Sequence, residues 1–299
     1  MSAVRPPYVA YAQILAGALL LSTGAAAIKS VSFGVLELAG WRAAVIALFL
    51  GLAVRPPRRC WNVGLLPAAL AHAVTTLLFM WGNKLTSAAT AIFLQYTAPL
   101  YLLLLGPWLL REPRHRQDLG VMALIATGMS LLLLNPVNSS PHASNPALGS
   151  MVAATCGIAW ALTTLTMRGL SRQPDEGFRR AIAAVILANA GLALGLLPAV
   201  GMPAAATPLD WGIVGYMGVF QLGCAFILIS LGLRRVSAFE GSLLLLVEPL
   251  LSPLWAYVLH GETPGPLVFV GGALVLLASV LRLRKPAPVQ HAPVPQRRG

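Results

Sequence analysis

The 299-residue sequence has few charged residues. Asp, Glu, Lys and Arg make up 10% of it, hydrophobic residues make up 57%, and the mean hydropathy is +0.76. A soluble chain of this length needs more charge to cover its surface, so the composition predicts an integral protein of a lipid bilayer. Acidic residues are scarcest, 9 against 21 Lys and Arg. Such an excess of basic residues suggests nucleic acid in a soluble domain, but here they lie between apolar stretches, so we expect no nucleic-acid partner.

Cysteines and enzyme motifs are also scarce. Cys60, Cys156 and Cys224 have neither disulfide nor metal-ligand spacing, so we expect free thiols and no metal site. No nucleotide-binding motif is present, which excludes ATP as the direct energy source, and we expect no cofactor. The sequence has no G-x-S-x-G, no H-E-x-x-H and no paired aspartates inside an apolar stretch. An intramembrane enzyme is therefore the most distant alternative.

Long apolar stretches fill most of the chain. They lie at about 10–28, 36–54, 61–83, 87–110, 117–134, 148–167, 178–200, 211–233, 237–260 and 265–283. None alternates with period two, so a membrane β-barrel is excluded. The first is long enough to span a membrane and nine comparable stretches follow, which disfavours a cleaved signal peptide. We predict an all-α integral membrane protein with ten transmembrane helices.

The basic residues predict the orientation of these helices. With the N-terminus inside, all Lys and Arg except Lys29, Lys84 and Arg42 lie on the cytoplasmic side or in the tail. Cytoplasmic loops of membrane proteins carry such an excess. We therefore expect a multi-pass protein of the bacterial inner (plasma) membrane with both termini in the cytoplasm.

The two halves of the chain share a pattern. A shift of 150 residues places Lys84 on Arg234, Ser87 on Ser237, Pro99 on Pro249 and Glu112 on Glu262. We expect a five-helix repeat over 1–138, a second over 139–285, and a disordered Pro-rich tail over 286–299. Because five is odd, the second repeat enters the membrane with inverted topology.

Each repeat carries a proline inside an apolar stretch and a glutamate 13 residues later. That spacing is roughly 20 Å of helix, so the proline lies deep in the bilayer and the glutamate near its surface. A proline kinks the helix and frees a carbonyl, which lipid tolerates only beside protein or a water-filled cavity. We predict a cavity between the halves, with Pro99 and Pro249 as hinges and Glu112 and Glu262 in structural or gating roles.

Several polar and aromatic residues are expected near the middle of the membrane. Glu248, beside Pro249, contacts an amine of the cargo, acts as a proton-linked group that faces the cavity or, when protonated, bonds a freed backbone carbonyl. The other candidates for binding are His72, Phe79, Gln95, Tyr96, Trp160, Asn189 and Gln221. The polar ones have an alternative role in joining helices, and Trp160 lies away from the interfacial belts that explain most membrane tryptophans.

Arg42 lies about six residues into the second apolar stretch. Two interpretations stay open: an ion pair with Glu37, or a side chain that extends to the membrane surface. Neither places a cation at the depth of Glu248. A cargo carboxylate is therefore expected to meet neutral donors such as Gln221, Gln95, His72 and Tyr96.

The repeated proline and glutamate pattern, with Glu248-Pro249 in the second copy, resembles the EamA-type drug/metabolite transporters over about residues 10–283. Lys29, Glu37, Arg42 and Trp160-Ala161 support the resemblance, which is strongest to YddG-type amino-acid exporters. The chain departs from the family at Leu21-Ser22, where the first repeat usually carries Trp-Gly.

The resemblance implies a monomeric secondary transporter that exports small metabolites, chiefly amino acids of broad range, by alternating access. The alternative is an exporter of small organic cations or drugs. Members of that type hold an acidic residue in the first span, and residues 10–28 contain none.

Overall fold

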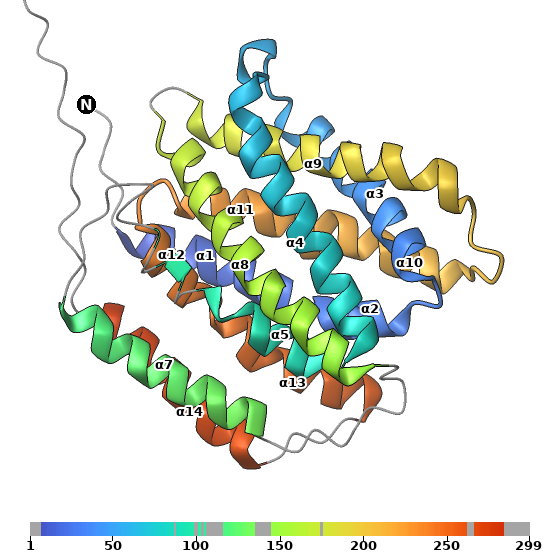
Figure 1. Cartoon of the computed structure of the whole chain (residues 1–299). Helices are drawn as coiled ribbons and strands as arrows, with labels where there is room; N and C mark the ends of the chain where they lie inside the picture. The colour runs from blue at the N-terminus through green and yellow to red at the C-terminus, as the bar shows by residue number, and fades with distance from the viewer. Residues whose placement is uncertain are drawn as a thin grey trace, which may run out of the picture.

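The computed structural model describes residues 7–86, 88–98, 101, 102, 105, 116–134, 145–173, 176–261 and 266–283. These residues form helices and no strand (Figure 1). The α-helices of the first half are α1 (Pro7–Ser22), α2 (Gly24–Ser30), α3 (Val35–Val54), α4 (Leu66–Leu85), α5 (Ala88–Gln95) and α7 (Arg116–Leu134). Those of the second half are α8 (Pro146–Ser171), α9 (Gly177–Val200), α10 (Pro208–Tyr216), α11 (Ala225–Gly232), α12 (Ala238–Leu245), α13 (Val247–His260) and α14 (Pro266–Leu283). Short 3₁₀ turns η1 (Arg58–Cys60) and η2 (Val63–Leu65) precede α4, and a π-helical segment η3 (Met217–Cys224) joins α10 to α11.

Seven segments of the described residues are long and apolar enough to cross a membrane, which confirms the predicted class. They are Tyr8–Ser30, Val35–Val54, Val63–Leu85, Ala147–Ser171, Gly177–Val200, Pro208–Gly232 and Phe239–His260. The other three expected spans correspond to α5, α7 and α14, so the count of ten stays a prediction. Pro99, Glu112 and Glu262 lie outside the described residues.

The two halves of the chain pack into each other. The most extensive contacts join α4 with α8, α3 with α9, α7 with α14, and α1 with α11. Each pair takes one helix from either half, and Figure 1 shows α7 and α14 side by side at the edge of the molecule. Neither half therefore buries its apolar faces alone, because each uses the other as its core.

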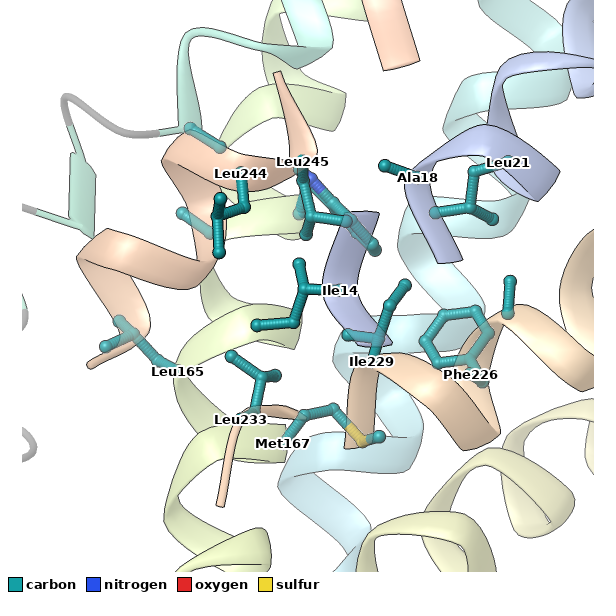
Figure 2. Packing of buried hydrophobic residues seen from close by; sticks show 14 of the residues in the cluster. Ile14, Ala18, Leu21, Leu165, Met167, Phe226, Ile229, Leu233, Leu244 and Leu245 are labelled. Carbon is teal, nitrogen blue, oxygen red and sulfur yellow. The ribbon is translucent and has the colours of Figure 1, made fainter. Parts of the chain in front are cut away.

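The largest buried cluster lies where α1 meets the second half. Figure 2 shows Ile14, which is fully buried, near Ile229 of α11, Leu233 directly after α11 and Leu245 of α12. The helices approach closely because glycine stands at the contact: a Cβ on Gly232 would lie 2.4 Å from Cγ1 of Ile14. Helices in lipid associate through such close packing, because burial from water does not drive them together there.

Three of these seven segments are interrupted, and α5 likewise ends inside an expected span. α1 gives way to α2 at Thr23, α5 ends before Tyr96, η3 separates α10 from α11, and α12 gives way to α13 at Leu246. The break at Leu246 is the one that Pro249 predicts, since a proline cannot donate to the carbonyl of residue i−4. At two breaks the chain tightens to i−3 bonds, with Thr97 N donating to Leu94 O at 3.2 Å and Leu246 N to Leu243 O at 3.1 Å.

Candidate functional site

A cavity lies where these helix breaks meet. Its empty space, counted out to the solvent at its mouth, is about 440 Å³. Seven lining residues come from the first half and five from the second: Leu21, Arg42, His72, Thr75, Thr76, Phe79 and Gln95, with Trp160, Gln221, Leu222, Phe226 and Glu248. The lining thus depends on side chains that face one another across the two halves.

Glu248 is the acidic residue of this lining. It is 4% exposed, and its carboxylate accepts a hydrogen bond from the hydroxyl of Tyr96, which is 1% exposed. Tyr96 follows the break after α5, and Glu248 follows the break before α13. The hydrogen-bond partner of Glu248 among the described residues is therefore a phenol from the other half, and the roles considered for Glu248 stay predictions.

His72 both lines the cavity and joins helices. Its Nε2 lies 3.1 Å from Nδ2 of Asn189, and that same amide nitrogen donates to Val185 O at 2.8 Å. With Asn189 as the donor, the ring proton of His72 lies on Nδ1, which has no partner among the described residues. Asn189 itself is fully buried behind His72 and does not line the cavity.

Gln221 is held against the break in the first span. Its Nε2 donates to Leu21 O at 3.4 Å, and its Oε1 has no partner among the described residues. A Cβ on Gly24 would lie 2.6 Å from that Nε2, so only glycine leaves room for the amide in this position. At the departure from the family pattern, Ser22 Oγ accepts from the indole of Trp255 at 2.9 Å, so a second-half tryptophan contacts this break.

An aromatic wall closes part of the cavity. Phe226 of α11 meets Trp160 edge-to-face with ring centroids 6.5 Å apart, and it meets His72 in the same way at 4.7 Å. Trp160 is 6% exposed and lies inside the molecule. Phe226 was not predicted, because a phenylalanine in an apolar helix has no contrast with its neighbours.

Arg42 corrects the sequence interpretation. It is 2% exposed, its Nη2 donates to Sδ of Met80 at 3.2 Å, and its Nε has no partner among the described residues. Glu37 instead accepts from Gly34 N at 2.7 Å. Both interpretations, the ion pair with Glu37 and the extension to the membrane surface, are therefore wrong. The expectation that Glu248 has no cation near its depth is wrong too, because Arg42 lines the same cavity.

Of the predicted binding residues, six line the cavity: His72, Phe79, Gln95, Trp160, Gln221 and Glu248. Tyr96 and Asn189 contact lining residues from behind, and Pro249 is buried beside Glu248. Thr75 and Thr76 also line the cavity; their spacing of three and four residues from His72 predicts the shared face, although neither was a predicted binding residue. The described residues hold no group of three or more His, Cys, Asp or Glu able to bind a metal.

A second polar cluster lies outside the spans, between the loop after α3 and the start of α9. Glu176 accepts hydrogen bonds from Arg59, from Arg179 at 3.4 Å and from the thiol of Cys60 at 3.0 Å. The bond from Arg59, followed by that from Cys60, lowers the pKa of Glu176 to about 2. Burial and the adjacent Glu176 raise the pKa of the Cys60 thiol to about 11.

The described residues thus form an all-helical membrane fold with a cavity lined from both halves, and comparison with known families gives its class. The sequence pattern of the EamA-like transporter family matches residues 9–134 and again residues 147–284. The chain therefore belongs to the EamA-like transporter family, with two copies of its repeat.

Known proteins agree with this assignment. An uncharacterized transporter of Archaeoglobus fulgidus is 26% identical over 92% of this chain and 96% of its own length. Another, of Methanothermobacter thermautotrophicus, is 26% identical over 74% of this chain, which spans 64% of that protein's length. A solved crystal structure superposes with a TM-score of 0.69 at 20% identity, over 91% of this chain and 95% of the other, and shows the fold alone.

Proposed function

We propose that this transporter exports amino acids of broad range by alternating access around the central cavity. The observation that carries the proposal is the lining itself: a buried carboxylate at Glu248 and an aromatic wall at Trp160 and Phe226 meet at helix breaks from both halves. The carboxylate suits the amine of the cargo, and the wall suits a variable side chain. Since most of the lining is neutral, binding is weak and tolerant, with a dissociation constant on the order of 1 mM.

The proposed topology is an inverted repeat of residues 1–138 and 139–285, in an inner membrane, with both termini in the cytoplasm. The pairing of helices between the halves supports a two-fold relation. If the two halves are exchanged, the contact between α4 and α8 becomes the contact between α11 and α1, and both contacts are present. In a background without Cys60, Cys156 and Cys224, a cysteine at Ser140 should label from outside and one at Arg58 from inside. Labelling of both from one side contradicts the inversion.

Counterflow in proteoliposomes tests the function. Vesicles loaded with an unlabelled amino acid should accumulate the labelled one, and a panel of small, branched and aromatic amino acids should compete to different extents. If no amino acid supports or competes with counterflow, the proposed cargo is wrong while the fold and family are unaffected.

Export of small organic cations is the second candidate, and Glu248 favours it by itself. Arg42 disfavours it, because a buried cation in the same lining repels a permanent cation that has no anionic group. Competition by tetraalkylammonium ions stronger than that by any amino acid would reverse this order.

A further inference from the structure

Arg42 is a charged residue of the cavity lining that has few hydrogen-bond acceptors around it. Its charge is buried, and the one hydrogen-bond acceptor that it contacts among the described residues is the thioether of Met80. A thioether is a weak acceptor and carries no charge. No carboxylate of the described residues lies within ion-pair distance of Arg42, and its Nε has no acceptor there. A buried guanidinium in such a place is stable only with a further partner.

Other polar groups of the same lining indicate the chemistry of that partner. Nε of Arg42 and Nδ1 of His72 are donors without acceptors among the described residues, and Gln221 Oε1 and the Glu248 carboxylate are acceptors on the same cavity. Guanidinium groups bind carboxylates through paired, parallel hydrogen bonds. A ligand with a carboxylate and an amine complements both sets, whereas a simple amine leaves Arg42 unpaired.

We propose that Arg42, with His72 beside it, is the carboxylate-binding subsite of the transporter, and that the cargo is therefore a zwitterion rather than a cation. This rests on the proposed function, since it divides the amino acid between two places. Glu248 and Gln221 receive the ammonium group, Arg42 and His72 receive the carboxylate, and Phe226 and Trp160 contact the side chain.

Ligands that lack either the carboxylate or the amine test the two proposed subsites separately. Binding to the purified full-length protein is measured as the rise in melting temperature with leucine, with isopentylamine, which lacks the carboxylate, and with 4-methylpentanoate, which lacks the amine. Counterflow of labelled leucine, competed by the same compounds, gives a second reading. In the wild type we expect leucine to bind about tenfold or more tightly than isopentylamine, because one charge-assisted pair is lost.

Arg42→Gln should abolish this preference. Leucine binding should fall about tenfold or more, and isopentylamine binding should stay the same or tighten, because the repulsion from the buried guanidinium is lost. Arg42→Lys keeps the charge but loses the paired hydrogen bonds of the guanidinium. Its affinity for leucine should lie between those of the wild type and Arg42→Gln. It replaces Arg42→Gln in the test if that variant does not fold. Arg55→Gln is the matched control, since it removes an exposed arginine from the end of the same helix.

Each outcome has a distinct meaning. An equal loss of leucine and isopentylamine binding in Arg42→Gln overturns the subsite and leaves Arg42 a packing residue or a partner of Glu248 in another conformation. If the wild type binds no amino acid but binds 4-methylpentanoate in a manner that requires Arg42, the proposed function fails and the subsite stands. If the wild type binds isopentylamine as tightly as leucine, the subsite fails while amine transport remains.

Discussion

Glu176 and Glu248 are both acids at contacts between the halves, and their surroundings differ. Glu176 receives hydrogen bonds from two arginines and a thiol. Glu248 receives one from a neutral phenol, and the arginine of its cavity contacts a thioether. Charges that the fold has fully paired are available only for structure, whereas charges left with weak partners in a cavity are available for a ligand.

The other end of the molecule supports the same distinction. Asp210, at the start of α10, accepts from the backbone and hydroxyl of Ser32, both at 3.0 Å, and from the backbone and hydroxyl of Thr207 at 2.9 and 2.7 Å. Its carboxylate is thus saturated by neutral donors. Glu176 and Asp210, which lie outside the cavity, thus have carboxylates satisfied by several donors, whereas Arg42 Nε and Gln221 Oε1 of the cavity lining have no partner among the described residues.

Glu248→Gln should have the largest effect on transport. The amide keeps an acceptor for Tyr96 and nearly the same volume, so the fold is preserved while the negative charge is lost. Counterflow of every amine-bearing cargo should fall about 10- to 100-fold, the range of a hydrogen bond to a charged group. Glu240→Gln, in the first turn of α12 where the carboxylate caps Ser237 N at 3.1 Å, is the matched control and should transport normally. Normal transport by Glu248→Gln would show that its charge is not used.

Pro249→Ala should come next, because it restores a donor to the carbonyl of Leu245 and favours a continuous helix through Leu246. If the break is a hinge, the rate of counterflow should fall several-fold while cargo binding changes little. The break is then monitored by hydrogen exchange of the amides around Leu246, which should slow in the variant. Unchanged transport with an unchanged break would dispose of the hinge.

Trp160→Ala should have a smaller and selective effect. Loss of the aromatic contact removes about 0.5–1.5 kcal/mol, or about two- to tenfold in affinity, for cargo with large apolar side chains. Glycine and alanine should be affected less, since they do not reach the wall. Trp61→Ala removes a tryptophan that is 41% exposed and should leave the order of substrates unchanged. An equal loss for all substrates would assign Trp160 to packing.

Much of the cavity could be predicted from the sequence because polar residues in membrane spans are few. Glu248, Gln95, Gln221 and His72 stand out against apolar neighbours, and their similar depth predicts that they meet. The break before Pro249 follows from the missing amide hydrogen alone. Their roles in binding stay predictions.

Arg42 could not be placed from the sequence, because its direction depends on how α3 rotates against its neighbours. Six residues into a span, an arginine reaches either the membrane surface or the interior. The packing of α3 against α9 and η3 decides this. There a Cβ on Gly218 of η3 would lie 2.4 Å from Cγ1 of Val45, so glycine lets the π-helical segment approach α3. A single glycine does not reveal this contact in advance.

The smallest expected effect on transport belongs to Glu176→Gln, which tests the paired end of the comparison. The variant loses the charge that Arg59 and Arg179 contact, so its melting temperature, followed by tryptophan fluorescence, should be lower at pH 7 while the order of substrates stays the same. An altered order of substrates would contradict a purely structural role.

The contribution of Glu176 to the stability of the fold should depend on pH in a predictable direction. The pKa of Glu176 is about 2 in the folded protein, below its value of roughly 4.3 in an unfolded chain. Its contribution to stability is therefore complete above the unfolded value and is lost as the pH falls toward the folded one. The melting temperatures of wild type and Glu176→Gln should differ most at neutral pH and converge as the solution is acidified.

Arg59→Gln should lower the melting temperature in the same way as Glu176→Gln. The double variant should be little less stable than either single variant, because both substitutions remove the same ion pair. A difference that persists unchanged in acid would mean that the carboxylate acts through its shape and not through its charge.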